Sequence, residues 1–216
     1  IIGTGSKPND LNIPGVKDNS LYFHKLRDVE ILKKKIQLLK NSHDPESKLV
    51  VVGAGATGVE LACKLGDILQ GCTEINLIEL GKRILPMSKA FNQEQAEKAL
   101  LKRSINIHLG TRVVSVTQNQ VQIEKQVNGE ILSTSIKNQG LIWTAGTKSS
   151  IPLIDIEFPI SKGYLPINSC LQVKGLDNVL CVGDAAFHAE NPWPSSAQVA
   201  MQQGKVAANN LQQLKE

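Results

Sequence analysis

Apolar residues between positions 26 and 39 recur with the spacing of an amphipathic helix. They lie three or four residues apart, at Leu26, Val29, Leu32, Ile36 and Leu39. Because such steps return to one side of a helix, we predict about four helical turns here. Segment 41–47 contains a proline and is expected to end this helix. Segment 6–20 carries proline and glycine turn signals and is expected to be a loop.

Two apolar runs flank a glycine-rich turn and a second helical pattern. Residues 48–52 are rich in valine, which is typical of a strand buried on both faces of a parallel sheet. Residues 53–58 turn into an apolar helix, and residues 74–80 return as a second strand. This order predicts a β-α-β unit. Asn92 is then expected to cap a helix that runs to about residue 103.

The hydrophobic period changes to two residues in the next part of the chain. Alternating segments at 112–117, 120–127 and 131–137 predict an antiparallel meander. Asn128-Gly129 joins the last two segments and is a preferred two-residue hairpin turn.

Shorter apolar runs predict strands at the opening of the chain, at 141–144 and at 178–182. A final helix is expected from about residue 195 to residue 214. The fold class is therefore α/β: a Rossmann-like domain with a parallel sheet and an antiparallel β-meander.

Composition and charge narrow the possible functions. The chain has 216 residues, 41% hydrophobic and 20% charged, which is typical of a globular protein with one large domain or two modest ones. A net charge of +4 is too small to indicate nucleic-acid binding. The four cysteines form no CxxC pair and the four histidines are scattered, so no metal site is expected. No transmembrane-length apolar run and no signal peptide are visible.

The glycine-rich turn has the spacing of a dinucleotide-binding motif, Gly53-x-Gly55-x-x-Gly58. Gly53 permits the tight turn, Gly55 lets a pyrophosphate approach the backbone, and Gly58 lets the helix pack on the strand. The helix N-terminus offers free N–H groups to the phosphates. We predict that this turn binds the cofactor through Gly53, Ala54, Gly55, Ala56, Thr57 and Gly58.

Glu79 ends the next strand, about twenty residues after Gly58, where the motif requires an acidic residue. Its carboxylate is expected to accept hydrogen bonds from the adenosine ribose. A carboxylate repels a 2′-phosphate, so NADH is favoured over NADPH. Lys82 and Arg83 follow closely and could partly offset that repulsion.

Three further segments do not belong to an isolated NAD domain. Residues 1–6 (IIGTGS) and 141–147 (LIWTAGT) are two copies of an apolar strand that ends in a Thr/Ala-Gly turn, and residues 178–186 (NVLCVGDAA) end in Gly-Asp. In these segments the chain resembles the pyridine-nucleotide-dependent flavoproteins, which bind two dinucleotides. The resemblance implies that Thr4-Gly5 and Ala145-Gly146 are the crossings between an FAD and an NAD domain. It also implies that Gly183 and Asp184 bind the ribityl chain of FAD.

Within that family, residues 58–62 (GVELA), 83–86 (RILP) and 195–204 (SSAQVAMQQG) resemble the type II NADH dehydrogenases, NADH:quinone oxidoreductases. By this resemblance Glu60 lies near the nicotinamide and Gln198 near the quinone-facing side of the flavin, as the candidate catalytic residues. Two ordinary alternatives stay open. An acid in a first helical turn is favoured by the helix dipole, and a glutamine can belong to a polar helix face.

The resemblance also implies a domain division. Residues 1–24 and 143–216 are expected to form a partial FAD-binding domain, into which an NAD-binding domain at 25–142 is inserted. The family's first β-α-β unit should precede residue 1 and a C-terminal extension should follow residue 216, so we expect an internal fragment of a longer enzyme. The fragment itself is expected to bind NADH at best and to be inactive alone.

The expected whole enzyme uses FAD and NAD(P)H, transfers hydride from NADH to the flavin, and passes electrons to a quinone. The resemblance further implies a peripheral membrane protein on a cytoplasmic or organellar-stromal face, attached through the C-terminal segment, and a possible homodimer. The alternatives are a related flavoprotein with a protein or disulfide acceptor, and a non-catalytic NAD-binding module.

Overall fold

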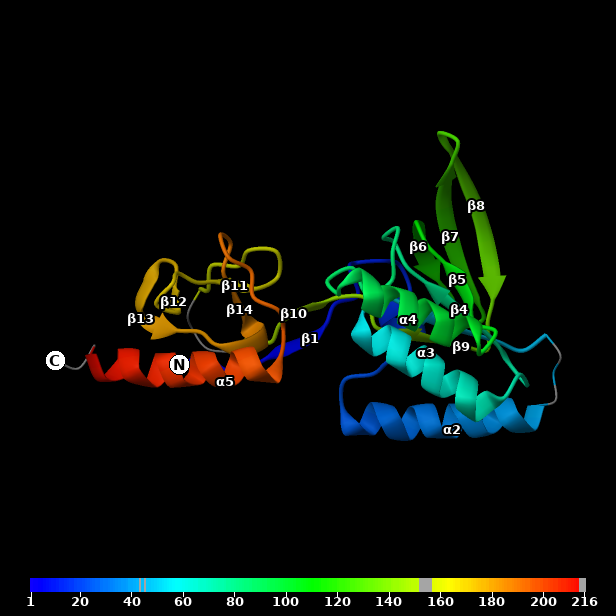
Figure 1. Cartoon of the computed structure of the whole chain (residues 1–216), viewed down its shortest axis with the longest axis horizontal. Helices are drawn as coiled ribbons and strands as arrows, with labels where there is room; N and C mark the ends of the chain where they lie inside the picture. The colour runs from blue at the N-terminus through cyan, green and yellow to red at the C-terminus, as the bar shows by residue number, and fades with distance from the viewer. Residues whose placement is uncertain (43, 45, 152–156, 214–216) are drawn as a thin grey trace. The chain divides into compact units, whose positions relative to one another are not determined.

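The computed structural model describes residues 1–42, 44, 46–151 and 157–213, and the chain forms two compact units (Figure 1). The contiguous unit is Asn9–Gly146, and the split unit combines Ile1–Pro8 with Thr147–Glu216. The chain thus passes between units at 8/9 and 146/147, whereas the sequence places the domain boundaries at 24/25 and 142/143. The nucleotide assigned to each unit stays a prediction.

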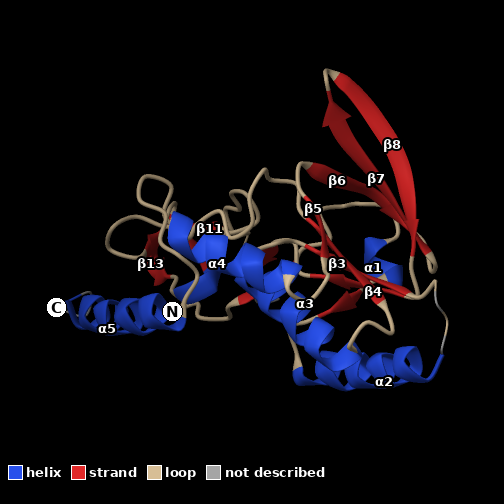
Figure 2. Cartoon of the chain, turned by 45° about the vertical axis from the view of Figure 1, so that its right-hand side comes forward, coloured by secondary structure: helices blue, strands red, loops and turns tan. Residues whose placement is uncertain are grey.

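A five-stranded parallel sheet forms the centre of the contiguous unit. Its strands, in spatial order, are β2 (Leu21–Tyr22), β9 (Gly140–Trp143), β3 (Lys48–Val52), β4 (Glu74–Ile78) and β5 (Asn106–His108). Three helices pack on one face (Figure 2): α2 (Leu26–Ser42), α3 (Ala56–Leu69) and α4 (Ala90–Leu101). The valines of β3 are buried on both faces, as the sequence predicts for such a strand.

The other face of the sheet packs against the antiparallel meander. Its strands are β6 (Thr111–Val116), β7 (Gln120–Val127) and β8 (Glu130–Lys137). Val50 and Ile78 of the sheet share a core with Val121 and Ile123 of β7. The hairpin turn is confirmed, since Asn128 and Gly129 both have positive φ, at 54° and 89°. The β7–β8 ribbon extends beyond this core, and its tip is exposed (Figure 1).

The split unit is built from short strand pairs and one long helix. Its elements are β1 (Ser6–Pro8), β10 (Thr147–Ser149), β11 (Leu165–Pro166), β12 (Gln172–Val173), β13 (Leu176–Leu180), the 3-10 helix η1 (Gly183–Ala185), β14 (Ala186–Phe187) and α5 (Ala197–Gln213). β1 pairs antiparallel with β10, and Ile2 forms a single parallel bridge with Cys181. A small core that includes Leu165, Ile167 and Ala207 lies between these elements and α5.

Several sequence predictions need correction. Segment 6–20 is not one loop, because it holds β1 and the short helix α1 (Val16–Asn19). Asn92 does not cap α4; Lys89 is the N-cap, and Asn92 lies inside the first turn. The predicted opening strand is reduced to a bridge at Ile2, which donates its N–H to the Leu180 carbonyl at 2.7 Å and accepts the N–H of Val182 at 3.0 Å. Residues 43 and 45 of the predicted helix break, and residue 214 of the final helix, lie outside the described residues.

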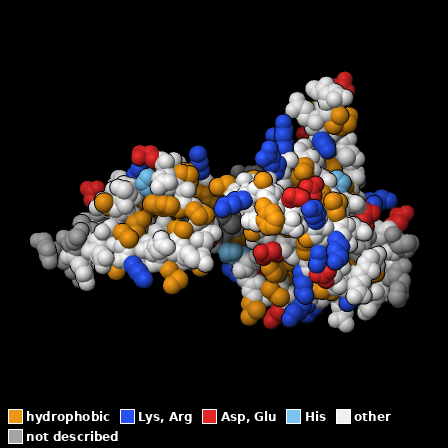
Figure 3. Space-filling model, viewed as in Figure 1, with side chains coloured by type: hydrophobic (Ala, Val, Ile, Leu, Met, Phe, Trp, Pro, Cys, Tyr) orange, Lys and Arg blue, Asp and Glu red, His pale blue; other side chains and the backbone are white. Residues whose placement is uncertain are grey.

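None of the helices among the described residues combines the length and apolar character needed to cross a bilayer. On the face drawn in Figure 3, basic and acidic side chains are interspersed over the contiguous unit.

A chain of polar side chains crosses the meander-facing side of the sheet. The Nε2 atom of His108 lies 2.8 Å from Oδ1 of Asn76, which is buried, and Asn76 donates from Nδ2 to Glu74 at 2.9 Å. The ammonium of Lys48 lies 3.2 Å from the same carboxylate. Burial lowers the pKa of the His108 imidazole, and the nearby Lys125 ammonium lowers it further.

This shift predicts a pH-dependent stability. Below the ordinary pKa of about 6.5, the unfolded chain binds a proton at His108 that the folded unit binds less well. The free energy of unfolding should therefore fall as the pH decreases from 7.5 to 5.5. His108→Gln should reduce that fall when measured by denaturant unfolding with circular dichroism, whereas His24→Gln, at an exposed position, should not. Equal pH dependence in His108→Gln and the unaltered chain would contradict the prediction.

Candidate functional site

The glycine loop connects β3 to α3 and is shaped by two close backbone contacts. Gly53 has φ +100°, and a Cβ there would lie 2.9 Å from Cα of Ala145. A Cβ on Gly58 would lie 1.8 Å from the carbonyl oxygen of Gly53. Both positions therefore require glycine for packing, whether or not a ligand is bound.

Gly55 differs from the other two glycines because it faces open space. It is the N-cap of α3, and an added Cβ would meet no atom within 4 Å. Gly55, Ala56 and Thr57 are exposed, while no acidic side chain lies in the first turn of the helix. The N–H groups and positive partial charge of this helix end are therefore accessible to an anion.

Glu79 lies directly beside the glycine loop. Its Oε2 accepts the N–H of Ala54 at 2.7 Å, and its Oε1 accepts the N–H of Gly81 at 2.7 Å. A carboxylate has about four lone-pair positions, so these two bonds leave acceptor capacity for further hydroxyl donors. The structure thus brings together the predicted phosphate loop and the predicted ribose acid.

The segment after Glu79 is tied to the same loop. Leu85 donates its N–H to the carbonyl of Ala54 at 2.8 Å, and Leu85 itself has φ +47°. Gln93 of α4 donates to the carbonyl of Leu85 at 3.0 Å. Lys82 and Arg83 follow Glu79 closely in the chain and are both exposed.

Thr144 supports the glycine loop, although the sequence analysis did not single it out as a site residue. Its hydroxyl lies 2.8 Å from the Val52 carbonyl and 3.1 Å from the Gly53 carbonyl, to which it donates. The adjoining turn places Ala145 against Gly53, and Gly146 has φ +82°. The Thr-Ala-Gly turn therefore supports the glycine loop from the neighbouring strand. The only sign of these hydrogen bonds in the sequence is the threonine itself, whose hydroxyl is a possible donor.

The first Gly turn lies in the split unit. Gly5 has φ +69° and accepts the N–H of Ser150 at 2.9 Å, while Thr4 is exposed. The strands that adjoin the two turns pair with each other, with Ser6 opposite Ser149 and Pro8 opposite Thr147. The similarity of the two turn sequences thus corresponds to two neighbouring chain segments.

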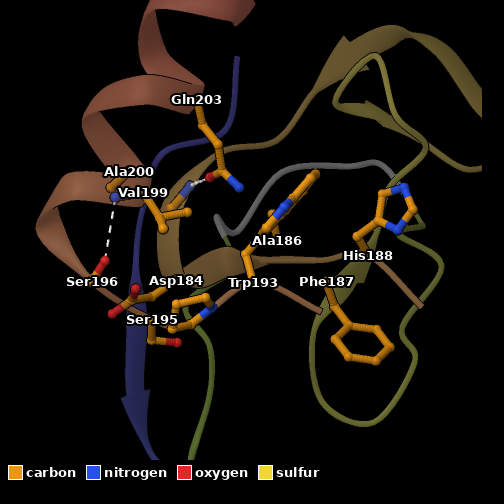
Figure 4. A pocket seen from close by; sticks show the side chains of 12 residues that line it. Asp184, Ala186, Phe187, His188, Trp193, Ser195, Ser196, Val199, Ala200 and Gln203 are labelled. Atoms are coloured by element: carbon orange, nitrogen blue, oxygen red, sulfur yellow. Dashed lines mark hydrogen bonds between the residues drawn. The ribbon is translucent and has the colours of Figure 1, made fainter. Parts of the chain in front are cut away.

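The Gly183–Asp184 corner lines a small pocket in the split unit (Figure 4). Gly183 has φ +66° and begins η1, and Asp184 is half-buried. Ser195 and Ser196, just before α5, lie on the same pocket. Ser196 accepts the N–H of Val199 at 3.3 Å, as an N-terminal capping residue does.

An aromatic pair forms another wall of this pocket. The rings of His188 and Trp193 are 5.0 Å apart, and Nδ1 of His188 accepts the N–H of Asn191 at 3.0 Å. Phe187 lies on the same pocket. These aromatic residues were not among the predicted site residues, because they share no motif spacing in the sequence.

The two predicted catalytic residues lie on surfaces. Glu60 is exposed on α3, and Gln198 is exposed on α5 and does not line the pocket of Asp184. They belong to different units, Glu60 to the contiguous unit and Gln198 to the split unit. Their catalytic roles stay predictions.

Comparison with known proteins places the chain in one family. The profile of the pyridine nucleotide-disulphide oxidoreductases matches residues 1–204. Demethylphylloquinone reductase NdbB of Synechocystis sp. is 34% identical over 215 residues, covering 98% of this chain and 52% of that protein. The mitochondrial external alternative NAD(P)H-ubiquinone oxidoreductase B2 of Arabidopsis thaliana is 30% identical, covering 86% of this chain and 36% of that protein. The chain thus spans about half the length, or less, of these two relatives.

Solved structures share the fold. NDH2 from Plasmodium falciparum in complex with NADH has a TM-score of 0.71 at 21% identity, over 85% of this chain and 43% of that chain. The water-forming NADH oxidase from Lactobacillus brevis bound to NADH has a TM-score of 0.70 at 20% identity, over 97% of this chain and 45% of that chain.

Proposed function

Because the chain belongs to the pyridine nucleotide-disulphide oxidoreductase family, we propose that its contiguous unit binds NADH along the glycine loop. One observation carries the proposal: the Glu79 carboxylate is fixed against Ala54, next to an accessible helix N-terminus. A pyrophosphate then lies over Gly55, Ala56 and Thr57, and the adenosine ribose lies within reach of Glu79.

The same geometry favours NADH over NADPH. The carboxylate accepts hydrogen bonds and donates none, so it suits two ribose hydroxyls and repels a 2′-phosphate. Lys82 and Arg83 are exposed nearby and reduce that repulsion. We therefore expect NADPH to bind more weakly, rather than not at all.

The split unit is proposed to contribute to an FAD site. The fit rests on three features of one small pocket: the half-buried Asp184, the glycine before it, and Ser195 and Ser196 just before α5. Asp184 can accept from a ribityl hydroxyl, and Gly183 leaves room for it. The chemistry that bound FAD would supply is to take up a hydride from NADH and to pass two electrons on to an acceptor. Thr4-Gly5 and Ala145-Gly146 are proposed as the crossings between the two cofactor domains.

For the whole protein, we propose NADH oxidation with a quinone as acceptor. Both relatives described above carry quinone reductase names, which supports a quinone over a protein or disulfide acceptor. In this proposal the chain's residues hold and orient the cofactors, and none acts as a covalent nucleophile. Glu60 is assigned to the nicotinamide end and Gln198 to the acceptor side. Peripheral membrane attachment and homodimerisation of the whole protein are part of the same proposal.

Isothermal titration calorimetry of the chain with NADH tests the nucleotide site. We expect saturable binding with a dissociation constant within the usual enzyme range of about 1 µM to 1 mM. NADPH should bind more weakly under the same conditions. No heat of binding at millimolar NADH, with the chain folded by circular dichroism, would contradict the proposal.

The activity is tested in a longer protein that contains this chain. We expect that protein to be yellow, to oxidise NADH, and to reduce a short-chain quinone faster than a ferredoxin or a disulfide. A colourless protein that binds NADH would instead indicate a non-catalytic NAD-binding module.

A further inference from the structure

Gln203 is a polar side chain on the apolar side of α5. Val199 and Ala207 lie four residues before and after it, and Ala207 is part of the core of the split unit. Gln203 itself is only 8% exposed. The other residues of this row are apolar. Because burial of an amide without a hydrogen bond costs free energy, the Gln203 side chain needs a polar partner.

That partner is the backbone N–H of Gly183, next to Asp184. The Oε1 atom of Gln203 accepts the N–H of Gly183 at 2.6 Å (Figure 4). Gly183 has φ +66°, and an added Cβ there would lie 3.5 Å from Cβ of Ala200. The backbone just before Asp184 is therefore held by a hydrogen bond to α5, and a side chain at Gly183 would come into contact with Ala200.

The other half of the amide is available to the pocket. Gln203 lines the same pocket as Asp184, and Figure 4 shows its amide nitrogen directed away from Gly183. Neighbouring Gln202 is exposed and does not line the pocket, so it provides a matched control.

We propose that Gln203 is a positioning residue, which fixes the Gly183 amide and thereby the direction of the Asp184 carboxylate toward a ligand in this pocket. The identity of that ligand as FAD rests on the proposed function. The positioning itself does not depend on the ligand, because the Gln203–Gly183 bond is formed in the protein alone.

Amide hydrogen exchange at Gly183 tests the first step, measured by NMR on the chain without ligand. Gln203→Leu removes the acceptor and should accelerate exchange at Gly183 by about tenfold or more. Gln203→Glu keeps an acceptor oxygen in the same place and should preserve slow exchange. Gln202→Leu should change nothing. Equal exchange in Gln203→Leu and the unaltered chain would overturn the proposal.

A double-mutant cycle with Asp184→Asn tests the second step in a longer protein that contains this chain, with FAD affinity measured by fluorescence quenching. If Gln203 acts through Asp184, Gln203→Leu should weaken FAD binding severalfold in the unaltered background and much less in the Asp184→Asn background. Equal losses in both backgrounds would overturn the positioning role. If that longer protein binds no FAD, the proposed flavin site fails, and the exchange measurement alone decides the role of Gln203.

Discussion

Replacing Gly58 with alanine should destabilise the contiguous unit by roughly 3 kcal/mol and abolish measurable NADH binding. The new Cβ would lie 1.8 Å from the Gly53 carbonyl oxygen and 2.8 Å from the hydroxyl of Thr144. Neither neighbour can move alone, because Thr144 is bonded to the carbonyls of Val52 and Gly53. The end of β3 and the start of α3 must therefore separate.

Gly55→Ala is the matched variant on the same loop. Its φ of −70° suits alanine, and its Cβ meets no protein atom, so we expect a change in unfolding free energy within about 1 kcal/mol. The methyl group would nevertheless occupy the side of the loop that a pyrophosphate approaches, so NADH affinity should fall at least about tenfold. Denaturant unfolding and calorimetry separate the two effects. Unaltered NADH affinity in a folded Gly55→Ala protein would remove the loop from the binding site.

Glu79→Gln should weaken NADH binding by about 10- to 100-fold, because charge-assisted hydrogen bonds contribute roughly 1.5–3 kcal/mol each. The variant keeps the shape of the side chain and loses its charge and one acceptor. Because the carboxylate also repels a 2′-phosphate, NADPH should lose less affinity than NADH, or gain some. The ratio of the two dissociation constants, measured by parallel calorimetric titrations, is therefore the informative quantity.

Glu30→Gln, at an exposed position of α2, is the control for the loss of one negative charge. It should leave both dissociation constants unchanged. If Glu79→Gln also leaves their ratio unchanged, Glu79 supports the glycine loop through Ala54 and Gly81 but does not contact the ribose.

Much of the contiguous unit was predictable because its signals are local. The helix at 26–42 follows from apolar spacing, β3 from a run of valines, and the hairpin from Asn128-Gly129. The glycine loop was predictable for a related reason, since its three glycines follow a fixed spacing between a strand and a helix.

The split unit was harder to predict because its strands have only two to five residues. A pair such as β11 and β14 joins residues 165–166 to residues 186–187, and its pairing depends on the surrounding fold rather than on periodicity. Asn92 shows the same limit on a smaller scale, because capping preference alone does not locate the start of a helix.

The site residues also differ in how far their signals are local. Gly53, Gly58 and Glu79 belong to a motif, whereas Thr144 and Gln203 act through partners 91 or 92 and 20 residues away. Gln203 did leave a trace in the sequence, as a polar residue between Val199 and Ala207 on an otherwise apolar row. Glu60 and Gln198 came from family resemblance alone, and their exposed side chains await kinetic tests.

The split unit also has a consequence for biosynthesis. Residues 9–146 leave the ribosome as one uninterrupted stretch, so their core can form while translation continues. Ile2, in contrast, emerges roughly 180 residues before its partner Cys181, a delay of about 10–35 s at ordinary elongation rates. During that interval Ile2 and β1 lack the partners that they have in the folded unit, and nascent-chain proteolysis should find them cleavable until β10 and the Cys181 segment have been made.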